Sequence, residues 1–160
     1  MRTMHAIKRI NFAREHPDWR FPHYETIAPA EAHNLGDRLA AALGLARPAD
    51  AVQFAHALDA RLLDAPGIGC DAQAESFDLL EVFGRLDIRP LEQLYINWVH
   101  FQDVDRMTTH DLVKYFPYLW YPGPDEIDLF DESFAWIVSI SASGRPRYWR
   151  TREMPRVSPG

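Results

Sequence analysis

The stretch FAWIVSIS, residues 134–141, decides the fold that we predict. Phe134, Trp136, Val138 and Ile140 recur with a period of two, so they would share one face of a β-strand. Two further strand-like runs lie beside it, IDLF at 127–130 and RYWRT at 147–151, and the breaks between the three runs, Asp131-Glu132-Ser133 and Ser143-Gly144, suit hairpin turns. We therefore predict a small antiparallel meander, with the Pro146 strand at its edge.

Upstream of this meander, the run LEQLYINWVHF at 91–101 is rich in β-branched and aromatic residues. Such a run is typical of a strand that is buried on both faces. Thr108 and Asp111 have the spacing of a capping box, which predicts a short helix over about 109–116. The second half of the chain is thus predicted to form the sheet.

The first 90 residues have the periodicity of amphipathic helices rather than of strands. The predicted helices cover residues 5–14, 30–43, 50–64 and 75–86, with the loop DAPGIGCDAQA at 64–74 between the last two. We predict a single α+β domain over 1–152, in which a helical part, 1–90, packs on a C-terminal antiparallel sheet, 91–152. The tail, 153–160, is predicted to be loose.

Composition and charge exclude several classes of protein. The chain has 160 residues, a net charge of −6 and one cysteine, Cys70. The negative charge argues against nucleic acid or an anionic membrane as the partner and favours a basic protein. A single cysteine permits no internal disulfide and fits the reducing cytoplasm. The N-terminus has no apolar segment typical of a secretory signal, and no apolar run is long enough to span a membrane.

The net charge is concentrated between residues 103 and 132. Eight carboxylates lie there against Arg106 and Lys114 only: Asp103, Asp105, Asp111, Asp125, Glu126, Asp128, Asp131 and Glu132. If the apolar residues of 127–141 face the helices, these carboxylates would lie on the rim or on an open face of the sheet, where water solvates them. The arginines of 145–152 could pair with part of this acidic rim.

No motif for phosphate binding, nucleophilic catalysis or zinc binding occurs, and Cys70 has no base beside it in sequence. The types of side chain that bind metals gather at His100, Asp103, Asp105, His110 and Asp111. Their spacing matches no ligand set of known geometry, and His100 falls on the predicted buried strand, so we expect no metal and no cofactor. A carboxylate pair such as Asp125 and Asp128 could do acid–base chemistry if one member were in an apolar environment.

The segments YINWVHFQDVDR and DLVKYFPYLWYPGPDEIDLFDESFAWIVSIS, within about residues 94–144, resemble small bacterial immunity proteins of polymorphic-toxin and contact-dependent inhibition systems. The landmark is the spacing of Tyr121-Pro122, Asp125, Asp131 and Trp136. The resemblance implies a cytoplasmic, non-enzymatic protein that neutralises a toxin domain by direct binding.

Together these observations predict a protein-binding module that holds a basic partner through an acidic, aromatic-bearing face. Carboxylates would steer the partner and aromatics would anchor it. The predicted contact residues are Asp103, Asp105, Trp120, Tyr121, Asp125, Glu126, Asp128, Asp131 and Glu132. Two alternatives stay open: a small enzyme that uses His100, Asp103, Asp105 and His110 or the Asp125 and Asp128 carboxylates, and a structural domain that self-associates as a homo-oligomer.

Overall fold

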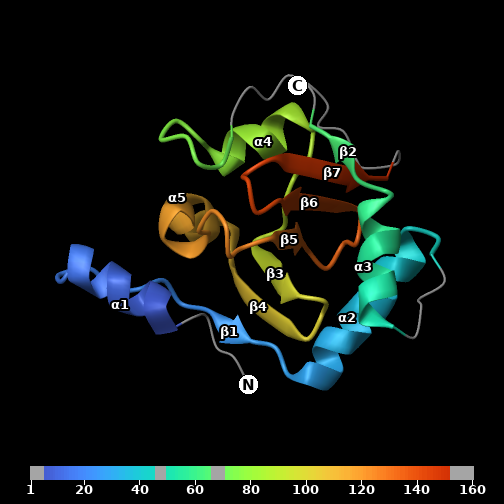
Figure 1. The fold of residues 1–160 in the computed structure, drawn as a ribbon, viewed down its shortest axis with the longest axis horizontal. Helices are drawn as coiled ribbons and strands as arrows, with labels where there is room; N and C mark the ends of the chain where they lie inside the picture. Colours follow the sequence, from blue (N-terminus) through green and yellow to red (C-terminus); the bar gives the residue numbers. More distant parts are fainter. Residues whose placement is uncertain (1–5, 46–49, 66–70, 152–160) are drawn as a thin grey trace.

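The computed structural model describes residues 6–45, 50–65 and 71–151 (Figure 1). Its helices are α1 (Ala6–Glu15), α2 (Pro29–Ala42), α3 (Ala51–Asp59), α4 (Leu79–Arg85) and α5 (Thr109–Leu119). Its strands are β1 (Glu25–Thr26), β2 (Leu63–Asp64), β3 (Gln93–Val99), β4 (Asp103–Thr108), β5 (Ile127–Phe130), β6 (Trp136–Ile140) and β7 (Pro146–Arg150). The predicted loose tail and part of the predicted loop at 64–74 lie outside the described residues.

The seven strands form one sheet in the order β1-β4-β3-β5-β6-β7-β2, and every neighbouring pair is antiparallel. β5, β6 and β7 form the predicted meander. Gly144 stands in the turn between β6 and β7 with φ at 93°, a conformation that glycine adopts without strain. The α+β class and the antiparallel sheet are therefore confirmed, although the sheet is larger than the sequence predicts.

Three strands were not predicted, and each has a local reason. β4 consists of DVDRMT, whose two aspartates have low strand propensity, so the segment carries no clear strand signal. β1 and β2 have only two residues each and carry no readable period. Because β2 pairs with β7, the Pro146 strand is not the edge of the sheet, and that prediction was wrong.

The helices also differ in length from the prediction. α1, α2 and α5 cover nearly the predicted ranges, and Thr108 caps α5 by accepting a hydrogen bond from the Asp111 amide at 3.1 Å. α3 ends at Asp59, short of the predicted 64, because the chain turns there to enter β2. α4 begins only after its cap, Asp78.

Helices cover both faces of the sheet, and this is the main correction to the predicted architecture (Figure 1). On one face, α4 and α5 pack over side chains such as Ile96, Leu129 and Trp136. On the other face, α2 and α3 pack over Tyr95, Phe130 and Ile137. Residues 94–98 of β3 are all buried, as predicted for a strand covered on both faces. The central strands therefore have no face that is wholly open to solvent.

One residue of the deciding stretch changes face. Trp136, Val138 and Ile140 share the α4–α5 face as the period of two predicts. Phe134 packs on the α2–α3 face instead, because it precedes β6 in the turn after β5 and has φ at 51°. The Arg38 guanidinium lies 4.4 Å from the centre of its ring.

The α1 helix is attached to the sheet by a buried ion pair. Lys8 is 2% exposed and donates to the Asp125 carboxylate and to the Leu119 carbonyl. Its ammonium also lies 4.6 Å from the ring centres of both Trp98 and Tyr121. Burial lowers the pKa of Lys8, whereas the hydrogen bond and charge of Asp125 oppose that shift.

We predict that Lys8→Met destabilises the protein by about 3–5 kcal/mol, because it leaves the Asp125 charge buried without a cation. The double variant Lys8→Met with Asp125→Asn should be more stable than Lys8→Met alone, because neither residue of the pair then carries a buried charge. Urea unfolding at neutral pH measures both free energies. Equal destabilisation of the single and double variants would show that packing of the lysine stem, not charge compensation, holds α1.

Candidate functional site

Four polar side chains form a row across the centre of the sheet. The backbone register places Asn97 of β3 opposite Asp128 of β5, Asp128 opposite Ser139 of β6, and Ser139 opposite Arg147 of β7. Directly opposed residues project to the same face of an antiparallel sheet, so the row lies on the α2–α3 face. The row thus interrupts a face that is otherwise apolar.

An apolar row lies two residues further along the same strands. Tyr95 opposes Phe130, and Ile137 opposes Trp149, and all four pack in the core under α2 and α3. Residues two apart on a strand project to the same face, so the two rows are parallel neighbours. The helices cover the apolar row closely and leave space over the polar one.

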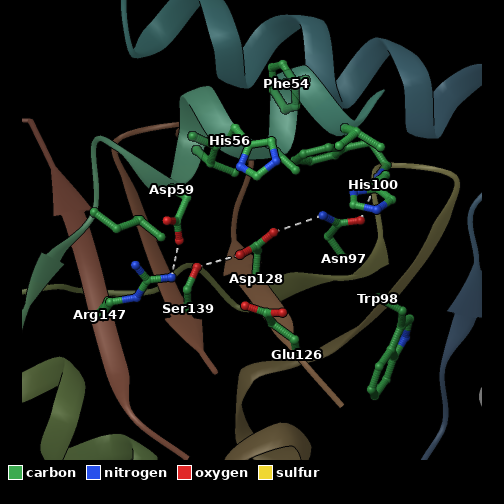
Figure 2. Close-up of a pocket in the computed structure, with 15 residues that line it drawn as sticks. Phe54, His56, Asp59, Asn97, Trp98, His100, Glu126, Asp128, Ser139 and Arg147 are labelled. Carbon is green, nitrogen blue, oxygen red and sulfur yellow. Dashed lines mark hydrogen bonds and ion pairs between the residues drawn. The ribbon is translucent and has the colours of Figure 1, made fainter. Parts of the chain in front are cut away.

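This space is a pocket of about 480 Å³ (Figure 2). The polar row forms its floor and α3 forms one wall, while its lip consists of the turn between β3 and β4 and the exposed lining residues Val52, His56, Asp59 and Glu126. The lining residues are Val52, Phe54, Ala55, His56, Leu58, Asp59, Leu62, Asn97, Trp98, His100, Phe101, Glu126, Asp128, Ser139 and Arg147. Its size falls within the range of about 300–1,000 Å³ that is typical of ligand sites.

Asp128 lies at the centre of the row and accepts from both neighbours. The Asn97 amide donates to its Oδ2 at 3.0 Å, and the Ser139 hydroxyl donates to its Oδ1. Burial raises the pKa of Asp128, and the charge of Glu126 adds to the rise, whereas these hydrogen bonds and the charge of Arg147 oppose it. A carboxyl with a raised pKa in a pocket is a common feature of functional sites.

At one end of the row Arg147 forms an ion pair with Asp59 of α3 (Figure 2). The predicted pairing of the C-terminal arginines with the acidic stretch holds only in part, because Arg147 forms its ion pair with Asp59 while its charge also acts on Asp128. Arg145 pairs with Asp64, and Arg150 lies 3.4 Å from a carboxylate oxygen of Asp87. The ion-pair partners of these three arginines all come from the helical half of the chain, so most carboxylates of 103–132 have other partners.

At the other end the row leads into the turn between β3 and β4. The Asn97 Oδ1 atom accepts from the Phe101 amide at 2.8 Å. His100 and Phe101 both have left-handed backbones, with φ at 44° and 58°, which is uncommon outside glycine. Phe101 is buried and packs edge-on against Phe54, with ring centres 5.3 Å apart. Burial of Phe101 fixes the turn and leaves His100 exposed at the lip.

The structure does not bring the nine predicted contact residues together. Glu126 and Asp128 belong to the pocket, and the others do not line it. Among them, Asp105, Trp120, Asp125 and Asp131 are buried, Tyr121 and Asp103 are partly buried, and Glu132 is exposed while accepting from the Tyr95 hydroxyl at 2.9 Å. The predicted exposed face is therefore wrong for three of its carboxylates and for Trp120.

Each buried carboxylate has a structural role. Asp131 accepts from the Leu91 amide, the Trp136 indole and the Ser133 amide, each at 2.9 Å, and so holds the turn after β5. Asp125 pairs with Lys8 away from the pocket, so Asp125 and Asp128 do not form an acid–base pair. Asp105 accepts from the Trp98 indole at 2.9 Å and from the Thr26 hydroxyl at 2.8 Å, which ties β1 to β4.

The predicted cluster of metal-binding side chains is also dispersed. His100 is exposed at the turn rather than buried on the strand, whereas Asp105 is buried. Of this cluster only His100 lines the pocket. Within the ranges that the structure describes, no group of three or more histidine, cysteine, aspartate or glutamate side chains could hold a metal ion. Cys70 lies outside those ranges.

Sequence reasoning missed most of the pocket. His56, Asp59, Asn97, Ser139 and Arg147 were not predicted as site residues. A signal was present, because Asn97, Asp128 and Ser139 are polar residues within the apolar runs YINW, IDLF and IVSI. What the sequence lacks is the register that aligns them, which depends on pairing between strands far apart in the chain.

Comparison with known proteins finds no matching family model and no match among curated proteins or solved structures. Along the described parts of the chain, no helix has the length and apolar character needed to cross a bilayer. The functional argument therefore rests on the geometry of the site.

Asp105 generates a prediction about pH and stability. Burial raises its pKa from 3.8 to about 6, with the Asp103 charge adding to the rise, while the bonds from Thr26 and Trp98 oppose it. The folded state therefore binds more protons than the unfolded state between these two values, and stability falls as pH rises through this interval. The loss is roughly 3 kcal/mol at most, and it is complete above the folded pKa.

We expect Asp105→Asn to remove this dependence, because an amide does not titrate in this range. Urea unfolding at about pH 4.5 and about pH 8 measures the free energy of unfolding of both proteins. That of the variant should rise relative to that of the wild type between the two pH values. Glu92→Gln, a change at an exposed carboxylate, is the control and should follow the wild type. If the free energies of unfolding of wild type and Asp105→Asn differ by the same amount at both pH values, the prediction is contradicted.

Proposed function

We propose that the protein is a binding module for a basic protein partner, and that the partner binds over the pocket on the α2–α3 face. The single observation that carries the proposal is the pair of carboxylates, Glu126 and Asp128, in a pocket where the nearby cation, Arg147, is already paired with Asp59. Glu126 forms no hydrogen bond or ion pair with any other described residue. A positive group from outside would complete this site electrostatically.

The lip of the pocket has the polar character of the rim of a protein interface. Its polar residues His56, Asp59, His100 and Glu126 are exposed, and Val52 beside them exposes 52% of its surface. Interfaces combine an apolar centre with a polar rim, and rim charges mainly steer the approach of the partner. The net charge of −6 favours a basic partner at longer range.

The backbone at His100 also supports a role at this lip. A histidine with φ at 44° is strained relative to glycine, and strained residues often persist at functional sites because the side chain is needed there. His100 contributes no core packing, since it is exposed. A contact with a partner would explain why a side chain stands at this position.

A toxin domain is the partner that we propose, following the resemblance of residues 94–144 to immunity proteins. In this proposal the protein acts in the cytoplasm, where it covers a basic, substrate-binding surface of the toxin domain. The proposed contact surface differs from the one expected from sequence alone. It keeps Glu126 and Asp128 from the acidic stretch and adds α3 and the turn between β3 and β4.

A small enzyme is the second candidate, favoured by the raised pKa of Asp128 in a pocket that also holds a serine and two histidines. A carboxyl of this kind can act as a general acid or base. Under this alternative Asp128→Asn would abolish turnover of a small substrate. Under the binding proposal no turnover exists, and variants at the lip change affinity alone.

The binding proposal is tested by reversing one charge at the lip. The partner is first captured on the immobilised full chain from extracts of the native cell, identified and purified. Glu126→Lys should slow its association by about 3- to 10-fold at low salt, with a smaller effect at high salt. Glu92→Lys makes the same charge change at an exposed position outside the pocket and should have little effect. Equal association rates for wild type and Glu126→Lys would refute the proposed surface.

His100→Gly separates stability from binding. Glycine adopts the left-handed backbone without strain, so the variant should be as stable as the wild type or more stable by up to about 1 kcal/mol. Binding of the captured partner should nevertheless weaken, because the imidazole is lost from the lip. Urea unfolding and surface plasmon resonance measure the two effects. Unchanged affinity would remove His100 from the interface.

A further inference from the structure

We propose that the pocket receives a single arginine side chain of the partner, with its guanidinium between the carboxylates of Asp128 and Glu126. This inference rests on the proposed function and names the group that the site recognises. Glu126 directly precedes β5, Asp128 lies within it two residues further along the chain, and both line the same pocket.

The free hydrogen-bond acceptors of Asp128 and Glu126 match the several N–H donors of a guanidinium. A carboxylate has about four lone-pair positions, and Asp128 uses one on each oxygen for Asn97 and Ser139. Two positions of Asp128 and the whole carboxylate of Glu126 therefore remain for a ligand. A guanidinium carries five N–H donors in a rigid plane and can reach two carboxylates at once, whereas an ammonium places three donors around a point.

The charges of the pocket also favour a bound cation. Three carboxylates, Asp59, Glu126 and Asp128, stand against one guanidinium, Arg147, so the lining carries −2 when all are ionised and both histidines are neutral. One arginine would reduce this to −1 and relieve the repulsion between Glu126 and Asp128. Arg147 does not take this place, because Asp59 holds it at the end of the row.

The walls suit the rest of an arginine side chain. His56 lines the pocket from α3, on the side opposite Asp128, and Leu62 and Val52 add apolar surface (Figure 2). A guanidinium is weakly hydrated and stacks on planar rings, while its three-carbon stem packs against apolar groups. Trp98 extends away from the row in the same view and instead donates to Asp105, so it is not part of this contact.

The first experiment uses small analogues and does not need the partner. Nα-acetyl-arginine amide is titrated into the ¹⁵N-labelled full chain, and the side-chain amide of Asn97 and the backbone amides of Asp128 and Ser139 are followed by NMR. We expect saturable shifts at these positions with a dissociation constant in the millimolar range. Nα-acetyl-lysine amide should bind several-fold more weakly, and the citrulline analogue, an uncharged isostere of arginine, should not bind.

Variants then assign the binding to the two carboxylates. Glu126→Gln and Asp128→Asn should each weaken arginine binding several-fold, and Glu92→Gln should not. Glu126 is exposed, so its variant remains informative even if Asp128→Asn perturbs the floor. Absence of saturable shifts, equal binding of the citrulline analogue, or full affinity in Glu126→Gln would overturn the inference.

The two proposals fail in distinguishable ways. If the analogues do not bind while Glu126→Lys still slows association of the partner, the proposed interface stands and the arginine site is wrong. If the arginine analogue binds as expected but Glu126→Lys leaves the association rate of the partner unchanged, the pocket recognises arginine and the proposed protein interface is wrong.

Discussion

The constraint on which this structure depends is that helices cover both faces of its sheet. A carboxylate on the central strands then cannot rely on bulk water and needs hydrogen bonds, a cation or a pocket. Asp131 takes the first solution through two backbone amides and an indole, and Asp125 takes the second through Lys8. Asp128 takes the third, since its two hydrogen bonds leave it facing a cavity.

The pocket arises from a mismatch between the polar row and the helices above it. α2 and α3 close over Tyr95, Phe130 and Ile137, where burial of apolar surface is favourable. Covering Asp128 in the same way would remove the last solvent contact of a carboxylate that has no cation bonded to it. The end of α3 at Asp59, whose carboxylate turns to Arg147, leaves the row accessible. The pocket therefore lies where the polar row of the sheet extends beyond the end of the helical layer.

Asp125 and Asp128 show how neighbouring carboxylates of one segment acquire different roles. Asp125 precedes β5, where Lys8 of α1 reaches it beneath the rings of Trp98 and Tyr121. Three residues later Asp128 projects to the opposite side of the sheet, with hydroxyl and amide donors but no bonded cation. The first is a permanent structural pair, and the second keeps acceptor capacity for a ligand. The short distance between Asp125 and Asp128 in the sequence does not indicate that the two carboxylates have different roles.

The sequence by itself determined the elements whose signal is local. The period of two in 134–141, the apolar runs at 91–101 and 127–130, and the capping residue Thr108 predicted β6, β3, β5 and α5, because side-chain alternation and capping act over a few residues. Only the tertiary structure decided that helices cover both faces, that the polar DVDRMT segment is a strand, and that Asn97, Asp128, Ser139 and Arg147 align. Those outcomes depend on register and on contacts between residues far apart in the chain, and a one-residue slip in pairing would send Asp128 to the other face.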